Sequence, residues 1–356
     1  MGRKKTVLLT GIGGNTAQGV ARSLLEYPDE FRIIGVDSDR YNLLLGLRYV
    51  EKAYLVPRAG DEDYIDVLRK IIIKENVDVV IPSPDPEVYV ISKYRDELDA
   101  LLLLPSHRAI EIAQDKWLTY KTLLEKVGQP KTFLIQDYHS IVDAFNYLKA
   151  PVWIRKRRGA GGSKSFIAYT IEQADFWIRY WRGYGEFLVS ELLSGKNLSW
   201  IGLYKDGELV ASGGYLRIRY FMSHISPTGV TGNINVGVTI HDNQVNKVAE
   251  EAVKILDSTP NGIYTVDLKT KNNNNVDGEP LVTEINAGRF HMSFYVYTKA
   301  GLNLPYYYVK LALGEEVNLP PTKRNNVKPG VMTIRSTDNE PVILHANEIN
   351  KYINHA

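Results

Sequence analysis

Two segments far apart in the chain carry residues whose types and spacing suit a nucleoside triphosphate. The first, Arg155 to Ser163, reads Arg-Lys-Arg-Arg-Gly-Ala-Gly-Gly-Ser and offers cations and bare backbone to phosphate. The second, Glu284 to Arg289, reads Glu-Ile-Asn-Ala-Gly-Arg and offers oxygen ligands to a metal that accompanies phosphate. Alone, the first is also typical of a solvated basic turn and the second of a half-exposed strand. Together they predict a site for a triphosphate and its metal.

The composition limits the chemistry of this site. The 356 residues are 44% hydrophobic, which is enough for two or three domains with buried cores. The lack of cysteine excludes disulfides, thiol catalysis and thiolate metal sites, so a metal is expected to be a hard, oxygen-bound ion. A net charge of +2 from mixed signs, with no long apolar run, favours a cytoplasmic protein with neither a nucleic-acid nor a membrane partner.

The N-terminal segment predicts a doubly wound α/β unit. Strand-like runs at 7–10, 31–37 and 77–82 alternate with helical spacing at 17–26 and 64–75. The turn Gly11 to Thr16 and the acid Asp37 also suggest a dinucleotide site, but Thr16 stands where a third glycine is expected. A plain strand-to-helix turn is therefore favoured, and a nucleotide- or dinucleotide-binding regulatory protein stays open as an alternative function.

The middle of the chain changes from βαβ alternation to antiparallel patterns. Helical spacing covers 109–127, with an interruption at 114–116, and a second helix is expected at 140–148. The strand 151–155 delivers Arg155 and the basic loop to the end of a sheet. Further expected elements are strands at 186–193, 198–204 and 209–212, a helix at 243–256 and a hairpin of 262–269 with 280–286 around the polar tip 272–278.

That last hairpin predicts a metal site. Glu284 and Asn286 are two residues apart, so their side chains lie on one face of the strand, and Asp267 of the partner strand can join them. Three oxygen ligands suit Mg²⁺, which completes its octahedron with phosphate and water. Solvated strand acids are the alternative.

With these segments in this order, the chain resembles the ATP-grasp superfamily, in particular its carbamoyl-phosphate-synthase-like branch of carboxylate-amine ligases. The resemblance implies α/β and α+β architecture: a Rossmann-like pre-ATP-grasp domain (1–106), a small lid domain (107–185), a large domain (186–320) and a C-terminal extension (321–356). It also implies ATP between two antiparallel sheets, with one or two Mg²⁺ ions and Mn²⁺ as an alternative ion.

The resemblance assigns roles residue by residue. Phosphate contacts and catalysis are implied for Lys116, Arg155 and Arg289, and ATP binding also for the flap residues Gly161, Gly162 and Ser163, the hinge residues Glu191, Leu192 and Leu193, and Asn197. The implied metal ligands are Asp267, Glu284 and Asn286. Four departures stand out. Asn197 replaces a common ribose-binding glutamate, and Lys156 replaces a common proline. Asp267 stands where relatives use Gln or Glu, and Ala287-Gly288 places Arg289 one residue late.

The implied reaction is phosphorylation of a small-molecule carboxylate by ATP, followed by attack of an amine on the acyl phosphate. A phosphotransferase on the same fold is the alternative within the family. Arg217, Arg219 and His291 are expected to hold the acceptor, because Arg217 and Arg219 alternate onto one strand face, although solvated arginines are the competing interpretation. The expected partners are the carboxylate and amine substrates, and a homodimer is left open.

Overall fold

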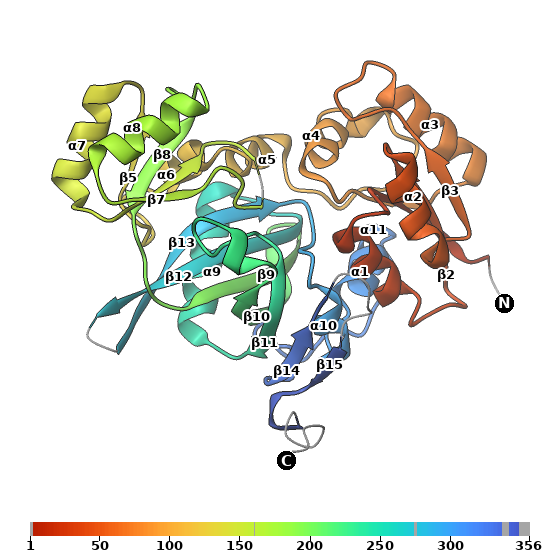
Figure 1. The fold of residues 1–356 in the computed structure, drawn as a ribbon. Helices are drawn as coiled ribbons and strands as arrows, with labels where there is room; N and C mark the ends of the chain where they lie inside the picture. The colour runs from red at the N-terminus through yellow and green to blue at the C-terminus, as the bar shows by residue number, and fades with distance from the viewer. Residues whose placement is uncertain (1–2, 160, 274–275, 337–341, 349–356) are drawn as a thin grey trace, which may run out of the picture.

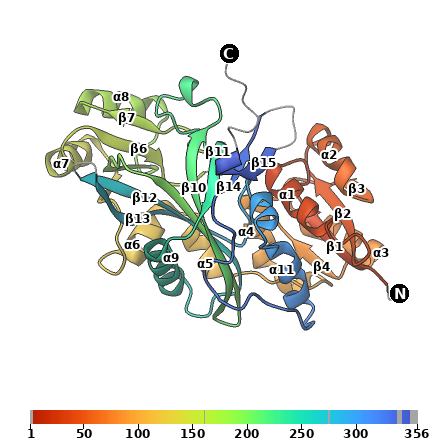
Figure 2. The same ribbon diagram turned by 90° about the horizontal axis from the view of Figure 1, so that it is seen from below.

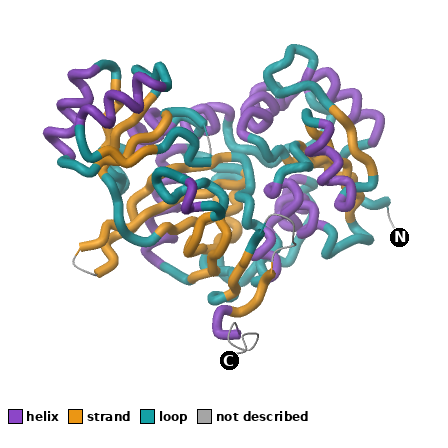
Figure 3. The backbone as a smooth tube through the Cα atoms, viewed as in Figure 1, coloured by secondary structure: helices purple, strands orange, loops and turns teal. Residues whose placement is uncertain are grey.

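The computed structural model describes residues 3–159, 161–273, 276–336 and 342–348 (Figure 1). The N-terminal α/β domain lies beside a large antiparallel sheet, and a smaller antiparallel sheet with two helices covers one end of that large sheet (Figures 1 and 3). The expected order of a parallel α/β unit followed by two antiparallel sheets is confirmed.

The N-terminal domain is a four-stranded parallel sheet in the order β3-β2-β1-β4. Its apolar strands are buried between helices on both faces, as the continuous hydrophobic runs predict. The bounds of its elements are β1 Lys5–Thr10, α1 Asn15–Leu24, β2 Phe31–Asp37, α2 Arg40–Gly46, β3 Lys52–Leu55, α3 Tyr64–Glu75, β4 Val79–Ile81 and α4 Asp85–Lys93.

The small sheet has the order β5-β8-β6-β7 with antiparallel pairing. Two helices pack on it and enclose a core of its own. The bounds are β5 Thr132–Ile135, α7 Tyr138–Leu148, β6 Val152–Lys156, β7 Phe166–Ala168, α8 Ile171–Tyr180 and β8 Phe187–Glu191. We call residues 130–191 the lid.

The large sheet has seven strands in the order β13-β12-β9-β10-β11-β14-β15. One of its cores is continuous with that of the N-terminal domain, so these two parts are held together by shared apolar packing that the lid does not share. The bounds are β9 Asn197–Lys205, β10 Glu208–Tyr220, β11 Ile234–Ile240, α9 Asn243–Leu256, β12 Gly262–Asn273, β13 Val276–Ala287, α10 Tyr295–Lys299, α11 Leu304–Ala312, β14 Val331–Ile334 and β15 Val342–His345.

Three segments lie elsewhere than the sequence suggests. β8 pairs with β5 and β6 in the lid sheet, although its sequence position places it in the expected large domain. The helices α5 (His107–Ala113) and α6 (Lys116–Leu123), which open the expected lid domain, pack against α9 and β13 instead. The expected C-terminal extension supplies β14 and β15 to the large sheet. Each difference arises from strand or helix pairing between segments far apart in sequence.

Seen from below, the lid and the N-terminal domain stand at opposite ends of the large sheet, with α10 and α11 filling the N-terminal end (Figure 2). In the part of the chain that the structure describes, no helix combines the length and apolarity needed to cross a membrane.

Candidate active site

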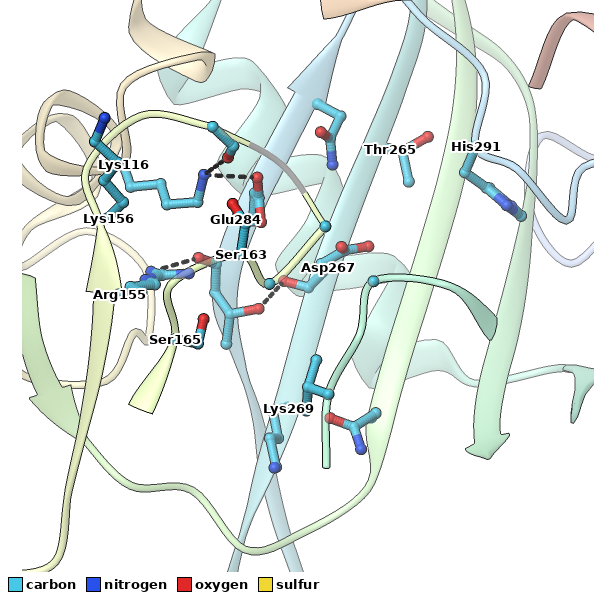
Figure 4. A pocket seen from close by; sticks show the side chains of 18 of the residues that line it. Lys116, Arg155, Lys156, Ser163, Ser165, Thr265, Asp267, Lys269, Glu284 and His291 are labelled. Carbon is cyan, nitrogen blue, oxygen red and sulfur yellow. Dashed lines mark hydrogen bonds and ion pairs between the residues drawn. The ribbon is translucent and has the colours of Figure 1, made fainter. Parts of the chain in front are cut away.

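A cavity of about 650 Å³ separates the lid from the large sheet. The basic loop after β6 lines one wall and the hairpin of β12 and β13 lines the other (Figure 4). The two chemically suggestive segments of the sequence therefore face each other across one space. Of the candidate site residues, only Arg219 is missing from its walls; the wall includes Lys116, Arg155, Gly161, Gly162, Ser163, Glu191, Leu192, Leu193, Asn197, Arg217, Asp267, Glu284, Asn286, Arg289 and His291.

Lys116 connects the two walls. Its Nζ donates to the carbonyl of Gly159 in the basic loop at 2.7 Å and lies 3.0 Å from Oε1 of Glu284 (Figure 4). Arg155 also connects the lid to the hairpin, because its Nη2 donates to the carbonyl of Thr283 at 2.9 Å. Both cations are thus held where phosphate oxygens could replace protein acceptors.

Asp115 fastens the basic loop, and the sequence analysis did not identify it. Its carboxylate is 1% exposed, caps α6 through the N–H groups of Trp117 and Leu118, and accepts from Arg157 at 2.7 and 2.8 Å and Arg158 at 3.0 Å. Burial opposes ionisation, but these donors lower the pKa of Asp115. An acid at the break of the helical pattern was the available signal, because aspartate is a preferred residue at a helix N-cap.

The glycines of the basic loop lie close to the loop that follows β10. Gly161 and Gly162 have φ of +74° and +65°, which favours glycine at both positions. A Cβ on Gly232 would lie 2.3 Å from Cα of Gly161, and one on Gly162 would lie 3.1 Å from the carbonyl oxygen of Val230. The backbones of the two loops therefore lie close to each other over the cavity.

The oxygen ligands predicted for a metal share one face of the hairpin. Asp267 is the cross-strand partner of Glu284, and Thr265 is the partner of Asn286. The Thr265 hydroxyl is buried in the cavity wall without a hydrogen-bond partner among the described residues. Strand alternation accounts for this shared face, as expected.

Each of these oxygen ligands is bound by a cation of the protein. Asp267 accepts from Arg217, Glu284 from Lys116 and Asn286 from Arg289. Burial would raise the pKa of Glu284, but the charges of Lys116, Arg155 and Arg289 lower it below its ordinary value. Glu284 is therefore ionised, with protein cations as its counter-charges.

This donor set fits Mg²⁺ held jointly with phosphate. Two carboxylates and one amide oxygen leave several octahedral positions for phosphate and water. Among the residues that the structure describes, no group of three or more His, Cys, Asp or Glu side chains could by itself hold a metal ion.

The opposite end of the cavity carries the hinge segment and an unexpected lysine. Glu191 forms an ion pair with Lys271, while Leu192 and Leu193 line the wall. Lys269 is the cross-strand partner of Asn197 and lies two residues from Asp267 on the same strand (Figure 4). Burial lowers its pKa, and within the described chain its ammonium has no hydrogen-bond or ion-pair partner. Its two-residue spacing from Asp267 was the available signal.

The three residues expected at the acceptor separate into two groups. Arg217 lies in the wall, bound to Asp267 and, at 3.2 Å, to the Ser199 hydroxyl. Arg219 does not share that face: the pairing with β11 shifts register between the two arginines, and Arg219 is exposed and donates to Asn235. A β-bulge thus breaks the alternation on which the expectation depended.

His291 lies in the wall at the end away from the hinge (Figure 4). It is 6% exposed, its Nε2 has no partner among the described residues, and its Nδ1 accepts from the N–H of Ser293 at 3.2 Å. Burial, followed by the charges of Arg217, Arg289 and Arg335, lowers its pKa to about 3. His291 is therefore a neutral imidazole at physiological pH.

Arg289 ties this end of the cavity to the N-terminal domain. It binds Asn286 of its own hairpin and Asp85 at the start of α4. Although one extra residue precedes Arg289, its side chain still lines the cavity wall.

The N-terminal glycine turn is filled by contacts from the protein itself. Asp37 accepts from the N–H groups of Gly13 and Asp39, both at 3.0 Å, and is 6% exposed. A Cβ on Gly13 would lie 2.2 Å from the carbonyl oxygen of Asn42. These contacts favour the structural turn over the dinucleotide alternative.

Comparison with known proteins agrees with this geometry. Residues 7–102 match the family model for the PylC-like N-terminal domain, and residues 113–292 match the model for the ATP-grasp domain. The tyramine–L-glutamate ligase of Methanocaldococcus fervens is 27% identical over 239 residues, which cover 66% of this chain and 67% of that protein.

Solved structures share the fold at low identity. The biotin carboxylase domain of the Hydrogenobacter thermophilus 2-oxoglutarate carboxylase, in complex with MgADP, ADP and bicarbonate, has a TM-score of 0.70 at 13% identity and covers 94% of this chain and 74% of that one. The L-amino acid ligase of Bacillus licheniformis has a TM-score of 0.66 at 14% identity and covers 94% and 79%.

Proposed function

We propose, from the premise that this chain belongs to the ATP-grasp family, that it is an ATP- and Mg²⁺-dependent ligase that joins a small-molecule carboxylate to an amine. One observation carries the proposal: the carboxylates of Asp267 and Glu284 and the cations Lys116 and Arg155 line a single cavity and neutralise each other across it. A triphosphate and its metal bring the same two kinds of charge, and so could replace these contacts pair by pair.

The residues suggest a division of labour. The basic loop and Lys116 would hold the β- and γ-phosphates, and the hinge from Glu191 to Leu193 the base. Asp267, Glu284 and Asn286 would hold Mg²⁺, which supplies charge neutralisation for phosphoryl transfer. The Thr265 hydroxyl, which has no partner within the described part of the chain, and the Lys269 ammonium offer two further polar contacts within the same walls.

The first step is an in-line displacement. A carboxylate oxygen of the substrate forms a bond to the γ-phosphorus, and the bond between that phosphorus and the β,γ-bridging oxygen breaks, which leaves ADP. Arg289, Arg155 and Lys116, which line the cavity, would offset the negative charge of both reactants.

In the second step, the amine attacks the acyl carbon, phosphate leaves and the nitrogen loses a proton. Neutral His291 lies in the wall near Arg289 and Arg217, and its Nε2 has no competing partner among the described residues. Because Nδ1 accepts from Ser293, the neutral ring carries its proton on Nε2, which is a candidate to donate a hydrogen bond to an oxygen of the acyl phosphate.

The test is turnover with defined pairs of substrates. The name of the curated relative suggests L-glutamate with tyramine as the first pair. A ligase releases ADP and phosphate only when acid and amine are both present, and mass spectrometry finds the condensed amide. Repeated turnover to ADP with acid alone, and an acyl phosphate in the enzyme-free filtrate that added hydroxylamine converts to a hydroxamate, would indicate the phosphotransferase instead. Thermal stabilisation by NAD and none by MgATP would favour the regulatory alternative.

A further inference from the structure

The lid sheet has an open edge at β5. In the part of the chain that the structure describes, β5 pairs with β8 alone. The carbonyl of Lys131, just before β5, accepts from the N–H of Glu191 in β8 at 2.9 Å. Backbone groups of successive strand residues point to opposite sides, so those of Thr132 and Leu134 point away from β8. Their N–H and C=O groups are therefore available to another strand.

A groove of about 510 Å³ runs along this open edge. On one side α6 contributes Trp117 and Tyr120, whose rings stack with centroids 5.5 Å apart. On the other side Tyr147 of α7 lies 5.5 Å from the ring of Phe133 and is 63% exposed. Figure 1 shows β5 at the margin of the lid, with α6 and α7 near it. A strand added at β5 would therefore also cover aromatic surface.

The sequence of β5 does nothing to prevent such pairing. Open edges in natural proteins are usually protected by charges, proline, bulges or short strands. β5 reads Thr-Phe-Leu-Ile and keeps a regular register with β8, whereas the opposite edge strand, β7, has three residues. The β5 edge is thus the better template for a further strand.

β5 is complementary to a second copy of itself. In an antiparallel pair centred on Phe133, Thr132 of each copy lies opposite Leu134 of the other, so that the outward N–H and C=O groups of both residues are bonded. Phe133 then lies opposite its counterpart in a pair without hydrogen bonds, where side chains approach most closely. Tyr147, already beside Phe133, would join this contact. One two-fold register therefore satisfies the whole edge.

The charges at the ends of the strand agree with this register. Lys131 is exposed and would lie opposite Ile135 of the other copy. Asp137, also exposed, follows Ile135 by two residues, which is the spacing of a diagonal neighbour on the same face. The two-fold axis repeats this pair of opposite charges at the other end.

We propose that the chain forms a dimer with a second copy of itself through β5, so that the two lid sheets become one continuous sheet. The pairing involves strands of four residues, and such a small contact suggests a dissociation constant of about micromolar size. This inference goes beyond the proposed function and does not depend on it.

The first test is the mass of the full-length protein in solution. Sedimentation velocity from about 1 to about 200 µM should show a monomer that becomes a dimer as concentration rises. Leu134→Pro removes an outward N–H at a position where an edge strand tolerates proline, and should raise the dissociation constant at least about tenfold, because a carbonyl of the other copy loses its donor. A melting temperature near that of the wild type would show that the lid still folds.

A charge variant tests the register more finely. Lys131→Glu places a second acid near Asp137 of the other copy and should raise the dissociation constant about fivefold. Lys70→Glu makes the same change on the exposed side of α3 and should leave it unchanged.

The second test uses the lack of cysteine in this chain. In Phe133→Cys, the two substituted residues would lie opposite each other with Cα atoms about 4.5 Å apart, which a disulfide can span, so mild oxidation should give a covalent dimer. Ile167→Cys in β7 is the matched control, because that residue is half-buried on the opposite edge of the same sheet, and it should remain monomeric in reducing-agent-free gels.

Each outcome decides the proposal. A reversible dimer that Leu134→Pro weakens, with a disulfide at Phe133→Cys and none at Ile167→Cys, supports it. A chain that stays monomeric at every concentration overturns it, and so does a dimer that persists unchanged in a folded Leu134→Pro variant. If Leu134→Pro does not fold, the disulfide test decides: equal crosslinking of Phe133→Cys and Ile167→Cys overturns the pairing.

Discussion

Two glycine-rich turns of this protein, Gly11 to Gly14 and Gly159 to Gly162, have similar compositions and opposite surroundings. In the first, the side chain of Asp37 bonds to the N–H of Gly13, and the backbone of Asn42 lies against the turn. In the second, Gly159 has open space around it, and a Cβ on Gly161 would meet no atom nearer than 3.9 Å. The first turn uses glycine for packing, and the second uses it to leave backbone facing a cavity.

The comparison shows why a glycine motif alone is weak support for a phosphate site. A nucleotide needs N–H groups and cations whose present partners can be exchanged, as those of Lys116 can. Where a carboxylate of the protein already satisfies the turn, as Asp37 does, an incoming phosphate would meet a negative charge instead.

The largest expected effect is in the cavity that the second turn faces. Glu284→Gln keeps the shape of the side chain but removes the charge that faces Lys116 and Arg155 and the proposed Mg²⁺. We expect ATP turnover to fall about 10³-fold, with a melting temperature close to that of the wild type. Steady-state ADP release measures the first and a thermal scan the second. The exposed Glu62→Gln is the matched control, and turnover at the wild-type rate in Glu284→Gln would remove that side chain from the metal site.

A pair of glycine substitutions tests the comparison directly. Gly13→Ala forces a Cβ against the backbone of Asn42 and should cost about 3 kcal/mol of unfolding free energy. Gly161→Ala has space but a φ of +74°, so it should cost about 1 kcal/mol and raise the KM for ATP. Denaturant unfolding and ATP kinetics on the two variants give the readouts. If a folded Gly13→Ala variant had a raised KM for ATP and Gly161→Ala did not, the turn from Gly11 to Gly14 would again be a candidate ligand site.

The pH dependence of stability tests the burial of His291 at the end of the cavity away from the hinge. The pKa of His291 is lowered from 6.5 to about 3, so protonation favours the unfolded chain and the contribution of His291 to stability is lost as pH falls from about 6.5 towards 3. Between pH 7 and pH 5 the wild type should lose about 2 kcal/mol more than His291→Gln.

The difference between the two proteins is the informative quantity here, because Glu87, whose burial raises its pKa to about 7, contributes with the opposite sign in both. Urea unfolding at the two pH values provides the measurement. A histidine NMR signal assigned to His291 that titrates near pH 6.5 would contradict its burial as a neutral group.

The smallest expected effect concerns Lys269. The Lys269 ammonium has no partner among the described residues, and replacing it by methionine removes its charge from the hinge half of the cavity while keeping most of the side chain's length. We expect affinity for ATP, ADP and AMP to fall by a similar factor, about tenfold, and affinity for adenosine to stay the same, because the lost contact is to phosphate. Fluorescence or calorimetric titrations test this, with the exposed Lys70→Met as control. An equal loss for adenosine would place the lysine at the sugar.

Much of the fold could be predicted because its signals are local. The helices α3 and α9 and the strand β2 begin and end where the apolar spacing indicates. Alternation along β13 also predicted that Glu284 and Asn286 share a face, and the pairing with β12 adds Asp267. The same rule failed for Arg219, because a bulge opposite β11 cannot be read from one strand alone.

The sequence by itself determined which groups were available and in what order: cations before a glycine loop, and oxygen ligands two residues apart on a strand. These follow from backbone geometry over a few residues. The tertiary structure alone decided that Lys116 meets Glu284, that Lys269 meets no counter-charge among the described residues, and that Arg335 comes beside α1. Such contacts join segments many residues apart, and their charges acquire meaning only when packing sets the distance between them and removes water.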